Sequence, residues 1–236
     1  MRQVCLLAAC AVAVAGSAPP KDPLLEQRIA ALETAVQRAP EDLFTAADYR
    51  QLVIASGDFD RSIRVLEKLA REKAAGPNVH LSLGLAYVDK VPAAGEIRRL
   101  YLARDAIAEA TRAIDREPSV LAYYFRGRVY LYLNNLLFKR AAQGVQDLQK
   151  ALTLVTPQTP PAMAAEVYTS LGDGYWWRFE DRVAARDAWR RGAERYPDAP
   201  ALKIRLSPDD EVVANAVWKA LRPDIRVDTT LRGLRP

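Results

Sequence analysis

The sequence predicts an all-α fold. Half of its 236 residues are hydrophobic, which is enough to form a core, and 11 are glycine. Ala, Leu, Arg and Glu are abundant, and no segment alternates apolar and polar residues as β-strands do. A helical signature in which a small residue lies between bulky ones recurs four times, most clearly at residues 83–87 and 171–175. Such recurrence predicts a stack of similar helix pairs.

Residues 1–18 are expected to be an export signal that precedes the helical fold. Arg2 supplies a positive charge, residues 4–15 are small or apolar, and an A-x-A pattern places cleavage near residues 15–17. The apolar run is shorter than the roughly 20 residues of a membrane-spanning helix. Residues 19–23 read as a linker. The protein is therefore expected to be exported, and to be periplasmic or associated with the cell envelope.

Cys10 offers an alternative interpretation of the N-terminus. Residues 7–10 resemble the lipobox of bacterial lipoproteins, in which the cysteine is lipidated and becomes the new N-terminus. Six residues precede this box, which is short for a signal, and the apolar residues after it make a poor soluble tether, so we favour simple cleavage. If the protein is attached to a membrane, we expect the attachment to be through this N-terminal lipid anchor alone.

The cysteine count and the charge exclude two classes of protein. Both cysteines, Cys5 and Cys10, lie in the N-terminal region, so the mature fold holds no disulfide. The formal net charge is +5, and most arginines have Asp or Glu close by in the sequence. This mild excess is not typical of nucleic-acid binding, which we do not expect.

A single helix begins the fold, and four helix pairs follow it. The first helix spans residues 28–40 and caps the stack, because a terminal apolar face has no neighbour. The pairs start near residues 43, 77, 120 and 165. The best copy has Tyr168, Leu171, Gly172 and Tyr175 on its first helix and Ala185, Trp189, Gly192 and Pro197 on its second. The earlier copies carry Arg50, Gly57, Ser62, Leu66 and Leu69, then His80, Leu83, Gly84, Tyr87, Ala106, Ala110, Ala113 and Pro118, then Tyr123, Gly127, Tyr130, Gly144, Leu148 and Ala151.

These positions resemble the tetratricopeptide repeat (TPR), a 34-residue helix-turn-helix with Leu-Gly and Tyr on its first helix and Ala and a closing Pro on its second. The resemblance implies a TPR solenoid, an α-α superhelix, over residues 24–206. Arg50 and Gly84 are 34 residues apart, but the next two intervals are 43 and 45 residues. We expect long inserts between the helices of these pairs, at residues 88–100 and 133–143. The small residues at repeat positions should allow close helix packing, with Tyr87, Tyr130, Tyr175 and Trp189 in the core.

A capping helix is expected over residues 207–222, followed by a tail over residues 223–236. Ser207 is a good N-cap, Pro208 suits the first helical position, and two aspartates follow at the positive end of the helix dipole. The apolar side of this helix would consist of Val212, Val213, Val217 and Leu221.

The TPR resemblance implies that binding takes place in the concave groove lined by the first helices. Repeat positions 2, 5, 9 and 12 make this groove apolar and aromatic, and they lack the Lys and Asn residues of the clamp that grips the C-terminal carboxylates of chaperones. The candidate partner-binding or ligand-binding residues are Leu81, Leu85, Tyr124, Arg128, Leu131, Asp173 and Trp176. Arg128 and Asp173, one repeat apart, either form an ion pair or flank a ligand.

An apolar groove either receives a partner or is filled by its own chain. The insert at residues 133–138 carries enough apolar bulk to fold back into it. Trp177 falls outside the groove positions, so at least one indole of the pair Trp176 and Trp177 is expected to pack within the fold.

The sequence offers little support for catalysis. His80 is the single histidine and occupies a repeat slot that usually holds a packed aromatic. The glycines do not form a phosphate loop, and a carboxylate pair such as Asp173 with Glu180 or Asp181 does not stand out from surface charge. We therefore expect a non-enzymatic protein without a catalytic site, cofactor or metal.

Two functions remain. The first is an exported TPR scaffold that binds a protein or peptide partner, as an amphipathic helix or an extended segment, at the cell envelope. The alternative is a periplasmic accessory protein that binds a small hydrophobic molecule or lipid, similar to the TPR partners of certain solute transporters. An open groove exposing Leu81, Leu85, Tyr124 and Trp176 favours the first, and a sealed apolar cavity favours the second.

Overall fold

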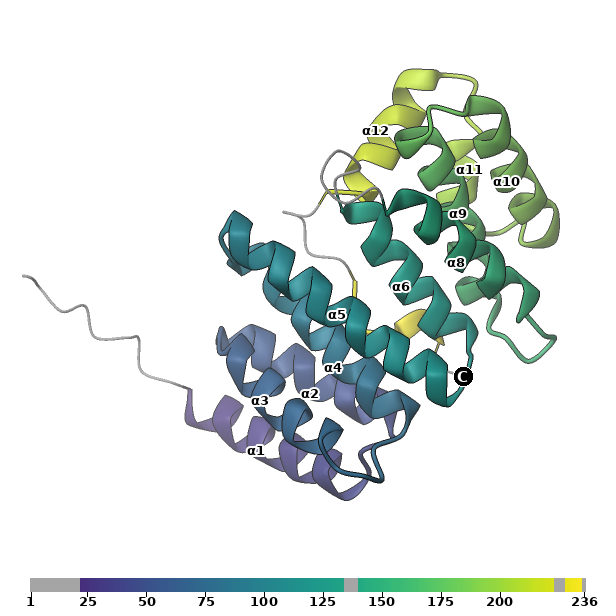
Figure 1. Cartoon of the computed structure of the whole chain (residues 1–236). Helices are drawn as coiled ribbons and strands as arrows, with labels where there is room; N and C mark the ends of the chain where they lie inside the picture. The colour runs from purple at the N-terminus through teal and green to yellow at the C-terminus, as the bar shows by residue number, and fades with distance from the viewer. Residues whose placement is uncertain (1–21, 134–139, 223–227, 235–236) are drawn as a thin grey trace, which may run out of the picture.

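The chain is all-α and its helices pack in sequential pairs, as the sequence predicts (Figure 1). The structure, a computed structural model, describes residues 22–133, 140–222 and 228–234. The N-terminal half contains α1 (Pro23–Arg38), α2 (Leu43–Ser56), α3 (Phe59–Ala70), α4 (Pro77–Lys90), the 3₁₀ turn η1 (Val91–Ala93) and α5 (Glu96–Arg116). The C-terminal half contains α6 (Val120–Tyr132), α8 (Ala141–Thr153), α9 (Pro161–Arg178), α10 (Arg182–Arg195), α11 (Pro200–Arg205), α12 (Asp210–Ala220) and the 3₁₀ turn η2 (Arg232–Leu234).

Local capping explains where the helices of the first pair begin and end. The Asp42 carboxylate accepts hydrogen bonds from the backbone N–H groups of Phe44 and Thr45, both at 3.0 Å, and so starts α2. Gly57 ends α2 with φ at +75°, a left-handed conformation that glycine adopts without the strain of a Cβ atom. Asp58 then leads directly into α3.

The extra residues expected between the two helices of the second pair, α4 and α5, are mostly helical. Residues 88–90 complete α4, and α5 begins at Glu96, so η1 and two further residues form the connection. The Arg99 guanidinium holds this short turn because its Nε donates to the carbonyls of Val91 and Ala94, at 3.1 and 2.8 Å. The expected insert therefore lengthens the second helix, and α5 has 21 residues. Of the second insert, residues 134–139 lie outside the described part of the chain, and α8 begins at Ala141.

Glycines allow the paired helices to approach closely. A Cβ atom at Gly172 of α9 would lie 2.1 Å from Nε1 of Trp189 on α10. The Trp189 side chain is fully buried, and its indole N–H donates to the carbonyl of Thr169 at 3.1 Å. In the preceding pair, a Cβ atom at Gly127 of α6 would lie 2.9 Å from the carbonyl oxygen of Gly144 on α8. No other residue fits these contacts without moving a helix.

The buried apolar side chains form two clusters, one in each half of the molecule. The first extends from Ile29 in α1 to Val129 in α6, and the second extends from Leu131 in α6 to Leu221, just after α12. Helix α6 therefore contributes to both clusters and joins the two halves. Among the tyrosines expected in the core, Tyr87 is buried, whereas Tyr130 and Tyr175 are half-buried.

The C-terminal cap differs from the expectation in two respects. Its N-cap is Asp209 instead of Ser207, because the Asp209 carboxylate accepts from the backbone N–H of Glu211 at 2.8 Å, and α12 begins at Asp210. Val212, expected on the apolar side, is exposed, whereas Val213, Val217 and Leu221 are buried. A short helix that the sequence pattern did not predict, α11, precedes α12 and packs against α9, α10 and α12.

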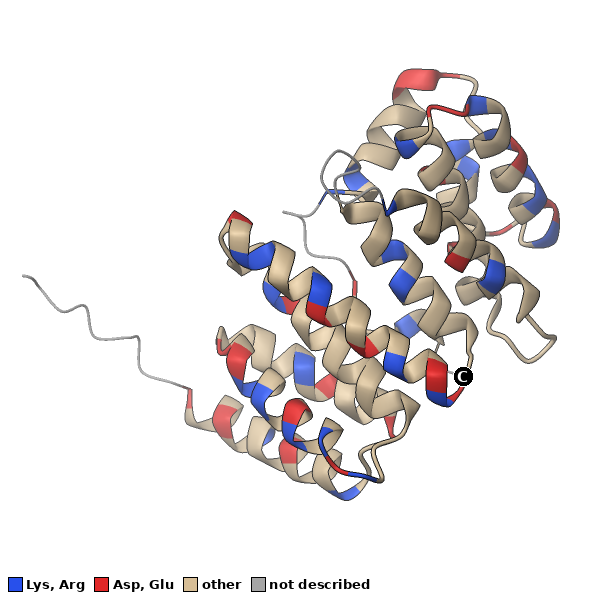
Figure 2. Cartoon of the chain, viewed as in Figure 1, with Lys and Arg blue, Asp and Glu red and all other residues tan. Residues whose placement is uncertain are grey.

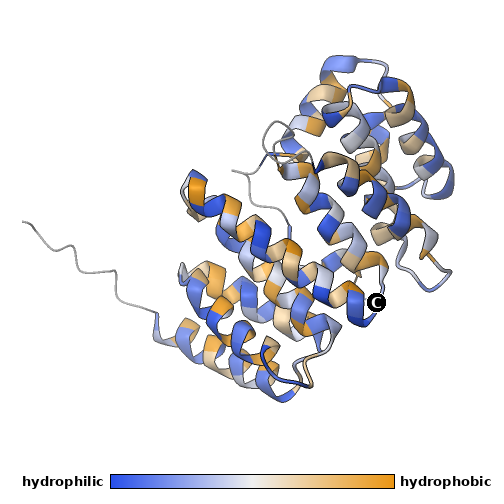
Figure 3. Cartoon of the chain, viewed as in Figure 1, coloured by the Kyte–Doolittle hydropathy of each residue, from blue (hydrophilic) through white to orange (hydrophobic). Residues whose placement is uncertain are grey.

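Charged residues of both signs are spread over the helices (Figure 2), and apolar residues are interleaved with them along each helix (Figure 3). Within the described ranges, no helix is both long enough and apolar enough to cross a membrane.

The two glycines of α9 should respond differently to a methyl group. Gly172→Ala would drive a Cβ atom into the buried indole of Trp189, and we expect it to lower the free energy of unfolding by about 2–3 kcal/mol. Gly174→Ala is the matched control, since its Cβ atom would meet side-chain methyls of Leu131 at 3.1 Å and the helix gains up to about 1 kcal/mol in propensity. Urea unfolding followed by circular dichroism measures both. Equal losses would contradict this account of the interface between α9 and α10.

Candidate functional site

The concave positions of the first helices are for the most part covered by the chain itself. Of the seven candidate residues, Tyr124 and Arg128 are half-buried. The other five are buried: Leu81, Leu85, Leu131, Asp173 and Trp176. The groove is therefore not open along its whole length.

Leu81 and Leu85 belong to the N-terminal core cluster. Helices α2, α3 and α5 all pack against α4, and Leu231 from the C-terminal segment packs onto the same cluster. These two leucines offer no surface to a partner in this structure.

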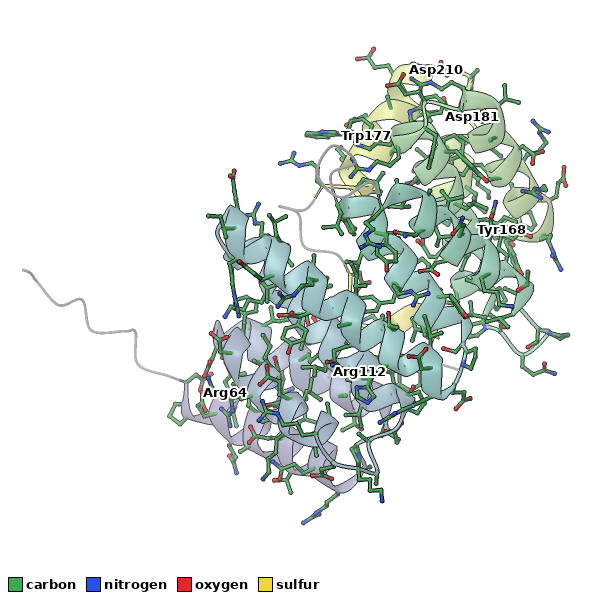
Figure 4. The ribbon with its side chains drawn as sticks, viewed as in Figure 1. Arg64, Arg112, Tyr168, Trp177, Asp181 and Asp210 are labelled. Atoms are coloured by element: carbon green, nitrogen blue, oxygen red, sulfur yellow. The ribbon has the colours of Figure 1, made fainter. Side chains whose placement is uncertain are left out.

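Leu131 and Trp176 pack within the second cluster. The Trp176 ring lies 5.5 Å from the Trp189 ring, measured between centroids, and the Arg182 guanidinium lies 3.5 Å from its centroid. The prediction that one of the two neighbouring indoles packs within the fold is confirmed. Trp177 is the other indole, and it is 41 % exposed and projects from the ribbon (Figure 4).

Asp173 is paired, but its partner is not Arg128. The Arg205 guanidinium of α11 donates from Nε and Nη2 to the two oxygens of the Asp173 carboxylate, the second bond being 2.6 Å long. Burial raises the pKa of the Asp173 carboxyl, and the bonds from Arg205 oppose this shift. The expectation that Asp173 faces the groove is wrong, because α11 docks onto α9 and covers it.

The hydrogen-bond acceptors of Arg128 in the described ranges are neutral oxygen atoms, while the charges of Glu166 and Asp173 act on it from further away. Its guanidinium donates to the hydroxyls of Tyr124, Ser170 and Tyr132, at 3.3, 3.1 and 2.7 Å. It also donates to the carbonyl of Ala220, at 3.1 Å, and so ties α6 to the end of α12. Burial raises the pKa of Tyr124 to about 12, although the nearby charge of Arg128 lowers it, so this phenol is neutral at physiological pH.

A cavity of about 900 Å³ lies beside Arg128. Helices α6 and α9 form one wall, the connection between α10 and α11 forms another, and the end of α12 and the C-terminal segment complete it. Apolar, aromatic and charged side chains share its lining, among them Leu121, Tyr124, Arg128, Tyr132, Glu166, Thr169 and Leu231. It is an accessible part of the concave face.

Residues 228–234 return from α12 to the N-terminal half (yellow in Figure 1). Arg50 of α2 donates to the carbonyl of Thr229 at 3.0 Å, and Gln51 donates to its hydroxyl at 3.2 Å. The Thr229 hydroxyl in turn donates to the carboxylate of Asp89, which also pairs with Arg50 at 2.5 Å. Arg50, Asp89 and Thr229 are all buried, so the segment is bound through a desolvated polar network.

Two leucines extend this contact to both halves of the molecule. Leu231 packs on the N-terminal cluster and Leu234 on the C-terminal cluster. Leu231 has φ at +59°, a left-handed conformation that is costly for a bulky residue and persists where surrounding contacts outweigh it. The segment thus fills the N-terminal part of the groove. The insert suggested for this role at residues 133–138 falls almost entirely outside the described residues.

The sequence analysis did not single out Arg50 and Asp89 as functional residues. A signal was present, because Arg50 stands where a TPR repeat requires a small residue for close packing. A charged side chain at such a position must be paired once it is buried. Its partners come from positions 39 and 179 residues away in the chain.

The remaining polar candidates have local roles. Nδ1 of the buried His80 lies 2.7 Å from Oε2 of Glu109. The Asp181 carboxylate caps α10 by accepting from the N–H of Ala184, at 2.9 Å. In the described part of the chain, His, Asp and Glu form no group of three that could hold a metal ion. Cys10 precedes the described residues.

Comparison with known proteins identifies the fold. No family model and no curated protein matches the sequence. The crystal structure of a thermophilic TPR protein from Thermus thermophilus superposes with a TM-score of 0.58 and 18 % sequence identity, over 82 % of this chain and 90 % of that one. The chain has a TPR-like fold. This result agrees with the repeat positions in the sequence.

The ion pair between α9 and α11 gives a direct test of this part of the TPR-like fold. Arg205→Met would leave Asp173 buried without its partner, and we expect a loss of about 3–5 kcal/mol in the free energy of unfolding at pH 7. The Asp173 pKa rises further in this variant. Because a raised folded-state pKa stabilises the protein as pH falls, the loss should be smaller at pH 4.5 than at pH 7.

The double variant Asp173→Asn with Arg205→Met should recover a large part of the loss, since it removes the unpaired charge. Urea unfolding of the wild type, Asp173→Asn, Arg205→Met and the double variant completes this double-mutant cycle. A double variant no more stable than Arg205→Met would contradict a role for this ion pair in docking α11.

Proposed function

We propose that this protein is an exported, non-enzymatic TPR-like scaffold that binds an extended segment of a protein partner in its concave groove at the cell envelope. The observation that carries the proposal is the binding of residues 228–234 within that groove. Within this segment, Thr229 forms hydrogen bonds with Arg50, Gln51 and Asp89. These contacts support the proposal that the groove binds peptide backbone and short polar side chains.

The accessible cavity beside Arg128 is the proposed partner site. It continues the groove next to the bound C-terminal segment, because Leu231 and Leu234 line it. The rings of Tyr124 and Tyr132 supply apolar surface and hydroxyl groups, a combination that suits peptide recognition. A partner segment would lie here, beside residues 228–234.

An alternative function is the binding of a small hydrophobic molecule or lipid, as in an accessory protein of a transport system. Two observations favour this alternative. The C-terminal segment closes part of the groove, and the cavity volume of about 900 Å³ lies within the range of small-molecule sites. The polar and charged side chains that line the cavity favour the binding of a peptide over the binding of a hydrophobic molecule.

Photo-crosslinking separates these functions. We expect p-benzoylphenylalanine at position 124, in the cavity, to form discrete protein adducts in an envelope extract of the source organism. The same residue at position 183 is the control, because Val183 is 81 % exposed on α10 and does not line the cavity. Identical adducts at both positions would contradict binding in the cavity. Adducts with lipid at position 124, and none with protein, would support the alternative.

Export rests on the composition of residues 1–18 and is tested separately. Intact-mass spectrometry of the protein purified from its native host should show an N-terminus near residues 16–18, after cleavage at the A-x-A pattern. A diacylglyceryl mass on Cys10 would support the lipoprotein alternative. An intact Met1 in protein from the cytoplasmic fraction would contradict export.

A further inference from the structure

Thr229 anchors residues 228–234 in the N-terminal half of the groove through its carbonyl and its hydroxyl. The carbonyl accepts from Arg50 at 3.0 Å, and the hydroxyl accepts from Gln51 at 3.2 Å and donates to Asp89. Thr229 is 2 % exposed, so these bonds are shielded from water. Ser and Thr are the residues with a short side chain whose hydroxyl both donates and accepts. The groove therefore binds a specific kind of residue at this position.

The groups that hold Thr229 belong to the helical solenoid. Arg50 of α2 and Asp89 of α4 are both buried, and they pair with each other at 2.5 Å. If residues 228–234 leave, Nη2 of Arg50 loses its acceptor and Oδ1 of Asp89 loses its donor. A second chain that places a carbonyl and a hydroxyl at the same points restores both bonds. An apolar residue at this position would leave the two groups unpaired, at a cost in free energy.

Leu231 places the bound segment at a disadvantage. Its side chain packs on the N-terminal core cluster, but its φ of +59° is a left-handed conformation that costs a bulky residue free energy. The segment compensates because it belongs to the same molecule, which gives it a high effective concentration at the groove. A segment of another protein that makes the same contacts without this conformation would displace residues 228–234 when a second contact holds it nearby.

We propose that the N-terminal half of the groove is a second part of the partner site, which residues 228–234 occupy until a partner segment displaces them. The partner segment carries a Thr or Ser in the place of Thr229 and a leucine or another aliphatic residue in the place of Leu231. The inference rests on the proposed function, because the cavity beside Arg128 supplies the contact that holds the partner next to residues 228–234. Leu231 and Leu234 line that cavity, so the two parts of the site are continuous.

A peptide with the sequence of residues 228–234 tests this competition. It is labelled with fluorescein, and fluorescence anisotropy measures its affinity for the full chain. Thr229→Val in the protein should increase that affinity at least about tenfold over the wild type. The reason is that valine keeps the size of threonine but forms no side-chain hydrogen bond with Gln51 or Asp89, so the segment of the same chain competes less well.

Thr230→Val is the matched control. Thr230 is half-buried, and its hydroxyl accepts from the backbone N–H of Arg232 within the same segment, at 3.4 Å. The substitution makes the same change one residue later, so the affinity for the peptide should stay at the wild-type value. Leu231→Ser should also increase the affinity, because it removes an apolar contact of the segment and leaves Thr229 in place. Circular dichroism checks the fold, and Leu231→Ser decides the test if Thr229→Val does not fold.

Changes in the peptide locate the specificity. With the Thr229→Val protein, a peptide that has Val in the place of Thr229 should bind at least about tenfold more weakly than the original peptide, and one that has Ser there should retain most of the affinity. Val in the place of Thr230 should have no effect on the affinity.

Failure of this inference differs from failure of the proposed function. Equal affinities of the wild type, Thr229→Val and Leu231→Ser for the peptide would overturn the displacement. Equal affinities of the peptides with Thr and Val in the place of Thr229 would overturn the recognition of a hydroxyl. Either result leaves the proposed function standing, because the crosslink at position 124 tests the cavity independently. Identical adducts at positions 124 and 183 would contradict the proposed function, and with it the partner assigned to this second site.

Discussion

The short distance between paired helices is the constraint on which the rest of the structure depends. Gly127 of α6 and Gly144 of α8 allow the backbones of these helices to contact each other, and Gly172 of α9 allows its backbone to contact the Trp189 indole. A Cβ atom at any of these positions would be too close to its neighbour. This contact fixes each pair as a rigid unit, and stacking such units gives one concave side to the first helices. The position of Tyr124 and Arg128 beside the cavity follows from this stacking. A looser interface would separate the residues that surround the cavity.

Buried and partly buried ion pairs add specificity to this packing. Each of the three arginine–aspartate pairs joins two helices, and the pair of Arg50 and Asp89 also fastens the C-terminal segment through Thr229. Pairs of this kind contribute little net stability, but breaking one is costly, so they disfavour alternative arrangements of similar helices. Arg128 lies among them, and its hydrogen-bond acceptors in the described ranges are three hydroxyls and a carbonyl.

The C-terminal segment gives the two halves of the groove different properties. In the N-terminal half it satisfies the buried polar groups and covers apolar surface. In the C-terminal half it forms one edge of a cavity whose lining is mixed and positively charged. A ligand in that cavity would contact both the solenoid and residues 228–234. Recognition would then depend on the integrity of the Thr229 network as well as on the cavity itself.

The sequence by itself determined the repeat, because spacing and residue size report the packing of neighbouring helices. Gly172 was identified as a close-packing position and Trp189 as a core residue from their repeat positions, and the all-α TPR-like fold followed. The sequence did not determine which polar side chains meet. Asp173 finds Arg205 on a short helix without a repeat signature, and Arg50 finds Thr229 at a distance of 179 residues. Such pairs depend on how the chain returns after the last repeat, and local pattern carries no information about that path. Tertiary structure alone therefore decided that Arg128 lies beside a cavity, with hydrogen bonds to three hydroxyls and a carbonyl.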